Sequence, residues 1–250
     1  MRHDVYIEND SNGFSVVPSA SVADVIADDR RNDHRFAAEH RALMLILNGD
    51  DSFPARLVVN EPLTTEEESE WIARVCWRLR IPCGTVLLCG GFDPRALDAW
   101  QAGEDAFAGA THSFGVPAGD YRVDVYTHRP TASGRIIEDS WPRPLGTWFR
   151  AEHPGEPFPG WMADEFQQIP EFDPGHEAEW ENAAALLRTG RLAADEGTAH
   201  AIGYLVHMQP WSPDSPLSRL PADGWFEPET GARVPPRCPR GLATAARPAD

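Results

Sequence analysis

The chain has 250 residues, a formal net charge of −17 and 22 basic residues, all of which are arginine. The lack of lysine excludes Walker-type phosphate loops, Schiff-base chemistry and a lysine general base, because each of these needs a primary amine. The acidic charge argues against nucleic acids and anionic membranes as partners, since phosphate groups are bound by basic surfaces.

Short segments rich in β-branched residues predict strands at residues 4–9, 14–18 and 21–27, with turn residues between them. Residues 41–47 form a nearly continuous apolar run, which is typical of a strand buried on both faces. A further strand at 55–60 follows the turn after this run, and the two are expected to form a hairpin.

A long helix is predicted at residues 65–79. Thr64 and Thr65 are each followed three residues later by a glutamate, which is the spacing of a capping box. Apolar residues then recur at helical spacing, and Pro82 prevents continuation. These apolar residues are Trp71, Ile72, Val75 and Leu79.

A strand, the pair Gly90-Gly91 and a helix starting at Pro94 are predicted next, with Asp93 as the N-cap. The glycine pair lacks the third glycine of a dinucleotide-binding loop, so it is interpreted as a plain turn from strand to helix.

Within residues 118–130, positions 121–128 alternate strictly and predict a half-exposed antiparallel strand. Arg122, Asp124 and His128 share its outer face and form a candidate polar cluster. The segment 116–128, Val-Pro-Ala-Gly-Asp-Tyr-Arg-Val-Asp-Val-Tyr-Thr-His, resembles strands of small bacterial β-sandwich proteins, some of which are immunity or inhibitor proteins. That resemblance implies a sandwich fold and a protein-binding role.

The chain is divided by prediction into three parts. Residues 1–139 form a strand-rich α+β domain, and residues 140–174, rich in proline and aromatic residues, form an ordered connection. Residues 175–250 form an extension with a helix at 175–193, a strand at 199–211, a proline-rich region and a mobile tail. The expected fold class is α+β, with an antiparallel, sandwich-like sheet core and the one long helix packed on it.

Two groups of residues are candidates for a functional site. Tryptophan and arginine are favoured at protein interfaces, although packing within proline-rich segments would also account for them. The interface candidates are Trp141, Trp148, Arg150, Trp225 and Arg233. No cysteine pair or histidine spacing indicates a metal site, and the alternative ligand set for a metal is His34, His40 and His128.

The leading hypothesis is a non-catalytic, acidic protein of the immunity or inhibitor type, of bacterial origin, that binds a basic protein partner without a cofactor. No signal peptide and no apolar run long enough to cross a membrane is visible in the sequence, which favours a cytoplasmic location. One alternative is a metal-dependent hydrolase that uses histidine and carboxylate ligands. Another is a secreted effector whose lysine-free surface avoids ubiquitin attachment.

Overall fold

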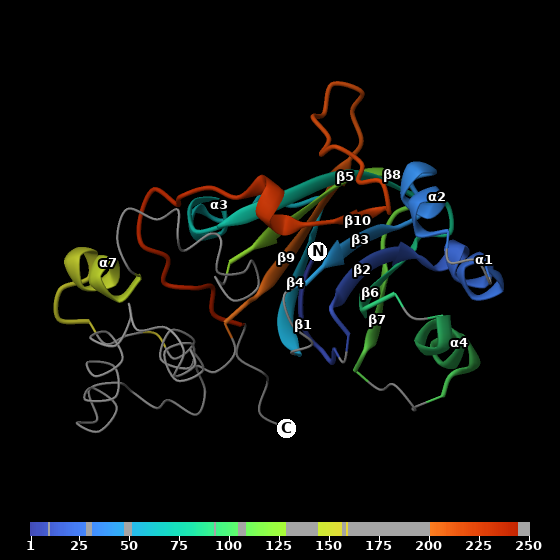
Figure 1. Ribbon diagram of the computed structural model, residues 1–250, viewed down its shortest axis with the longest axis horizontal. Coiled ribbons are helices and arrows are strands. Elements are labelled where there is room, and N and C mark those ends of the chain that lie inside the picture. The colour runs from blue at the N-terminus through green and yellow to red at the C-terminus, as the bar shows by residue number, and fades with distance from the viewer. Residues whose placement is uncertain are drawn as a thin grey trace.

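Two five-stranded sheets face each other across a shared hydrophobic core, and short helices cover one outer face (Figure 1). This computed structural model describes residues 1–9, 11–28, 32–47, 52–92, 94–104, 109–128, 145–156, 159 and 201–244. The mixed α+β class expected from the sequence is confirmed, and the two sheets are compatible with the expected sandwich-like arrangement.

The first sheet has the strand order β1-β4-β9-β8-β5 and the second has the order β10-β3-β2-β6-β7. The strands of the first sheet are β1 (Arg2–Ile7), β4 (Phe53–Val59), β5 (Ala73–Ile81), β8 (Gly119–Thr127) and β9 (Tyr204–Pro210). Those of the second are β2 (Gly13–Pro18), β3 (Leu43–Ile46), β6 (Thr85–Gly90), β7 (Thr111–Gly115) and β10 (Trp225–Phe226). The prediction of purely antiparallel sheets is wrong, because β4 pairs with β9 and β3 pairs with β10 in parallel.

Alternation along the strands builds the core between the sheets, because successive side chains point to opposite faces. In β8, Tyr121, Val123 and Val125 all point into this core. Where the two sheets meet, the Tyr204 ring lies 4.7 Å from Phe53 and 5.4 Å from Phe14. Aromatic rings packed in this way contribute both apolar burial and edge-to-face attraction.

Short helices cover the outer face of the second sheet. They are η1 (Ser19–Ser21), α1 (Val22–Ala27), α2 (Asp33–Ala38) and α4 (Pro94–Ala102). The prediction of a strand at 21–27 is wrong, since Val22 and Val25 lie one helical turn apart and both pack onto this face. The strand, glycine turn and helix predicted around Gly90 are confirmed as β6 and α4.

The long helix predicted at 65–79 is wrong. The capping box is present on Thr64 and Glu67, but α3 (Thr65–Ser69) has only five residues. Residues 73–81 instead form β5, in which Val75, Trp77 and Leu79 face the core. The apolar residues fit a period of two as well as a helical period, and pairing along all nine residues of β5 with β8 favours the strand.

The strands predicted at 41–47 and 55–60 exist as β3 and β4, but they do not form a hairpin. They lie in different sheets: β3 pairs with β2, and β4 pairs with β1 and β9. A buried apolar strand satisfies its backbone groups with any neighbour, so adjacency in the chain did not decide the pairing.

The C-terminal part of the chain supplies β9 and β10, which lie in the same two sheets as strands from residues 1–139. The predicted helix at 175–193 and the candidate Trp141 lie outside the described residues. Two further helical segments are α7 (Leu145–Glu152) and η3 (Pro228–Gly231). No helix in the described part of the chain is long and apolar enough to cross a membrane.

Replacing Gly90 by alanine is expected to lower the free energy of unfolding by about 2 kcal/mol, as overpacking does. A Cβ atom at Gly90 would lie 2.3 Å from the backbone oxygen of Glu8 and 3.1 Å from the Cα of Asn9. Gly115→Ala in β7 is the matched control, because a Cβ there meets nothing within 4 Å. Urea unfolding measures both variants, and equal midpoints would contradict the close approach at Gly90.

Candidate functional site

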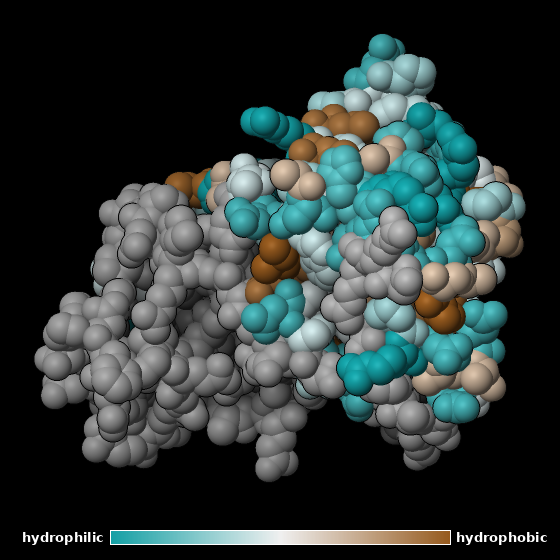
Figure 2. All heavy atoms as spheres, turned by 45° about the vertical axis from the view of Figure 1, so that its right-hand side comes forward, coloured by the Kyte–Doolittle hydropathy of each residue, from teal (hydrophilic) through white to brown (hydrophobic). Residues whose placement is uncertain are grey.

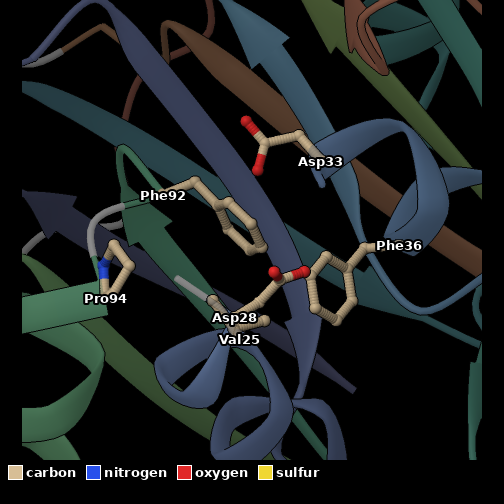
Figure 3. Close-up of a pocket in the computed structure, with 6 residues that line it drawn as sticks. All are labelled: Val25, Asp28, Asp33, Phe36, Phe92 and Pro94. Carbon is tan, nitrogen blue, oxygen red and sulfur yellow. The ribbon is translucent and has the colours of Figure 1, made fainter. Parts of the chain in front are cut away.

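A small pocket lies on the helical side of the second sheet, between α1, α2 and the start of α4 (Figure 3). Its lining residues are Val25, Asp28, Asp33, Phe36, Phe92 and Pro94. The rings of Phe36 and Phe92 contact each other edge to face with 6.1 Å between their centres, and in the close-up the carboxylate of Asp28 points toward them while that of Asp33 extends from the start of α2. Carboxylates beside aromatic rings are suited to a cation.

Both carboxylates of this pocket already have partners in the fold. Asp28 accepts a hydrogen bond from Arg35 at 3.2 Å, and Asp33 accepts one from the indole N–H of Trp225 at 2.8 Å. Trp225, an interface candidate, also packs edge-to-face on Phe92 at 6.3 Å. The hydrogen bond between Asp33 and Trp225 therefore links α2 to β10, and it fixes the Trp225 indole within the fold.

The predicted pair of Arg122 and Asp124 is present on the outer face of the first sheet, with 2.9 Å between the guanidinium and the carboxylate. Asp124 is only 1% exposed and also pairs with Arg74 of β5 at 2.6 Å. The strand is therefore not half-exposed at this point. Sequence reasoning missed the contact of Arg74 with Asp124 because residues 65–79 were interpreted as helix.

His128 does not join this pair. Its ring is fully buried, and Nε2 donates to the backbone oxygen of Glu67 at 3.2 Å. Burial lowers the pKa of His128 to about 4, so the ring is neutral at pH 7. Its Nδ1 has no partner in the part of the chain that the structure describes.

The Glu67 carboxylate, fully buried, is the centre of an ion cluster over β1 and β4. It pairs with Arg2 and, at 3.1 Å, with Arg56, and it accepts the backbone N–H of Thr64 at 2.8 Å. Burial alone raises the pKa of Glu67, but the Thr64 hydrogen bond and the two arginines outweigh burial and hold this pKa below its usual value. Arg56 is also bound by Asp4 at 2.6 Å.

Arg233, another interface candidate, holds the end of α3. Its guanidinium donates to the backbone oxygens of Glu68, Ser69 and Trp71, each at 2.9 Å. The same group lies 3.4 Å from the centre of the Trp71 ring. An arginine that binds the free carbonyls at a helix C-terminus stabilises that helix.

Trp148 and Arg150 both lie on α7 but in different surroundings. Trp148 is buried, and its indole N–H donates to Glu152 at 2.7 Å, whereas Arg150 is exposed. Glu152 in turn accepts the backbone N–H of Cys238 at 2.9 Å. Trp148, Trp225 and Arg233 thus contact three separate parts of the fold.

The alternative metal ligands are not gathered into one site. Among the described residues, no three His, Cys, Asp or Glu side chains lie close enough together to hold a metal ion. His34 is exposed on α2. His40 lies beside Trp77, with 5.6 Å between the ring centres and the rings tilted against each other, and His128 lies beneath α3.

Most of the positive charge in the described part of the chain is engaged within the fold. Guanidinium groups in ion pairs are those of Arg2, Arg35, Arg41, Arg56, Arg74, Arg78, Arg80, Arg122 and Arg240. By contrast, several exposed carboxylates make no ion pair with any described residue. They are Glu8, Glu66, Glu68, Asp98, Glu104, Asp214 and Glu227.

The face that carries the helices is mainly hydrophilic, and hydrophobic residues appear on it only in small separate spots (Figure 2). Asp98 and Glu104 are exposed on and just after α4, on this side of the molecule. No sequence motif marked these carboxylates, because their significance depends on which arginines the fold engages elsewhere.

No protein-family profile matches this sequence, and no curated protein matches it. Among solved structures, "Crocagin biosynthetic gene J" is 11% identical with a TM-score of 0.45, over 85% of this chain and 99% of that chain. ComJ from Bacillus subtilis, described as an inhibitor of the DNA-degrading activity of NucA, is 13% identical with a TM-score of 0.31. That match covers 55% of this chain and 87% of ComJ. Neither likeness identifies a family for this chain.

Proposed function

We propose that this chain is a non-catalytic, acidic protein of the inhibitor or immunity type that binds a basic protein partner. The observation that carries the proposal is the division of charge: arginines are engaged in ion pairs within the fold, while unpaired carboxylates face solvent. With a net charge of −17, the outward potential is strongly negative. Such a field speeds encounter with a positively charged surface and opposes encounter with an acidic one.

Native mass spectrometry of the protein, isolated gently from its own host, tests the proposal directly. A second protein chain with a net positive charge, bound in a fixed ratio, is the expected result. A partner with a net negative charge, or no partner at all, would contradict the proposal. A tightly retained metal ion without a partner would favour the hydrolase instead.

Reversing the two carboxylates at α4, in the double variant Asp98→Arg and Glu104→Arg, is expected to slow association with the recovered partner about tenfold at low salt. The rate should also depend less on ionic strength, because part of the steering field is removed. Stopped-flow or surface-based kinetics between 20 and 500 mM salt, roughly spanning Debye lengths from above 10 Å to a few Å, measure both effects. Gln101→Ala, an exposed neutral change on the same helix, is the matched control.

A further inference from the structure

A loop between β9 and β10 stands out from the body of the molecule. Residues 211–218, Trp-Ser-Pro-Asp-Ser-Pro-Leu-Ser, are named here the β9–β10 finger. In Figure 1 this orange loop rises beyond the ends of β5 and β8, and in Figure 2 it remains the highest part of the molecule.

The first side of the finger's base is fixed to the first sheet at Trp211. The backbone N–H of Trp211 donates to the backbone oxygen of Asp120 at 2.9 Å. The Arg78 guanidinium lies 5.3 Å from the centre of the Trp211 ring, and it also pairs with the Asp120 carboxylate. Trp211 is therefore held by both a backbone bond and a cation–π contact.

The second side of the base is fixed to Cys76 of β5. The N–H of Ser218 donates to the Cys76 oxygen at 2.8 Å, and the Cys76 N–H donates to the Ser218 hydroxyl at 3.0 Å. The Cys76 thiol also donates to the Pro216 oxygen at 3.0 Å. These contacts cover part of the outer edge of β5, and they set where the finger leaves the sheet.

The tip of the finger is stiffened by a turn and by two prolines. The N–H of Ser215 donates to the Ser212 oxygen at 3.0 Å, which closes a four-residue turn. Pro213 occupies the second position of this turn, where its fixed φ is favoured, and Pro216 restricts the backbone of the segment that returns to the sheet. A loop that is ordered before binding loses little conformational entropy when it binds.

The exposed groups of the finger combine one carboxylate with apolar surface. Asp214 is exposed at the turn, and no hydrogen bond or ion pair joins its carboxylate to the described residues. Leu217 is 37% exposed, and Pro213 and Pro216 are exposed beside it. A narrow, stiff projection of this kind fits a concave surface with a cationic floor and an apolar wall.

We propose that the β9–β10 finger inserts into a cleft of the basic partner, where Asp214 faces an arginine or lysine and Leu217 packs against the cleft wall. This inference rests on the proposed function, since it assigns the contact to that partner. It adds the site of contact, the shape of the partner's surface and the charge at the bottom of the cleft.

Site-specific photocrosslinking in the native host tests the contact. The photoreactive residue benzoylphenylalanine replaces Leu217 in one variant and Val234 in a control, because Val234 is equally apolar and 44% exposed. A crosslink to the partner from position 217 and none from position 234 is expected. Mass spectrometry of the crosslinked peptide should place arginine or lysine beside the attachment point.

The affinity of the reconstituted complex distinguishes a direct contact of the finger from the general electrostatic attraction of the whole protein. Asp214→Arg is expected to weaken binding at least about 30-fold, because a charge facing a desolvated cation is reversed. Glu227→Arg, an equal change of charge at an exposed carboxylate outside the finger that makes no ion pair with the described residues, should weaken binding only a few-fold. The double variant Pro213→Gly and Pro216→Gly should weaken binding about tenfold. It should also lower the urea midpoint modestly, because glycine increases the conformational entropy of the unfolded chain.

The outcomes distinguish the two proposals. If a basic partner binds but position 217 does not crosslink, or if the two charge reversals have equal effects, the finger proposal is overturned and the proposed function stands. If no basic partner is found, the proposed function fails and the finger proposal fails with it.

Discussion

Glu67→Ala is expected to lower the free energy of unfolding by about 3 kcal/mol, the largest loss among single substitutions considered for this fold. The substitution removes the one carboxylate that lies between Arg2 and Arg56, so that two guanidinium groups on the first sheet lose a buried partner. It also removes one half of the capping box that starts α3, the hydrogen bond from the backbone N–H of Thr64 to the Glu67 carboxylate, whereas the Thr64 hydroxyl still accepts the backbone N–H of residue 67. Urea unfolding at pH 7 measures the loss.

The neighbouring glutamates provide matched controls for Glu67. Glu66→Ala and Glu68→Ala remove the same chemical group from the same short helix, but their side chains are exposed. Each is expected to change stability by no more than about 0.5 kcal/mol. If Glu67→Ala falls within that range as well, the ion cluster does not stabilise the first sheet.

Acidification between pH 7.5 and pH 5 is expected to destabilise the protein by about 2 kcal/mol through His128 alone. Burial lowers its pKa in the folded state from 6.5 to about 4. Between these two values the unfolded chain binds a proton that the folded chain does not, so stability falls as the pH falls through this window. Below about pH 4 both states are protonated, and His128 adds no further loss.

His128→Gln is expected to flatten the dependence of the urea midpoint on pH, whatever the substitution does to stability at pH 7.5. A residual slope of the same sign should remain, because burial also lowers the pKa of His207. Gln101→Ala is the control, since position 101 is exposed on α4 and carries no titratable group, so the slope should stay as it was. A slope unaltered by His128→Gln would show that this ring titrates normally in the folded protein.

Strong local patterns were predicted correctly from the sequence. The alternation at 121–128 identified β8, and the Gly90-Gly91 pair identified the junction of β6 and α4. The capping box was also right, but it specifies where a helix begins and not where it ends. Trp77 and Ile81 at the core face of β5 fit only the period of two, and they were the signal against the helix at 65–79.

The candidate site was harder to predict, because its contacts join residues far apart in the chain. The pair of Arg122 and Asp124 was visible from spacing on one strand, whereas the contact of Trp225 with Asp33 spans 192 residues and has no local pattern. Arginine and tryptophan in proline-rich segments were candidates for an interface, with packing as the other explanation; Arg233 caps α3 and Trp148 is buried, so packing accounts for these two. Whether these arginine and tryptophan side chains reach solvent depends on which strands the proline-rich segments cover.

The position of β9 also bears on how the chain folds during synthesis. This strand lies between β4 and β8, yet it follows both of them in the sequence by many residues. Until the ribosome has released β9, the first sheet consists of two separate strand pairs, β1 with β4 and β5 with β8, and a two-stranded pair is marginally stable in water. The inner edges of β4 and β8 thus remain open to other nascent chains until β9, a strand made after both, closes them.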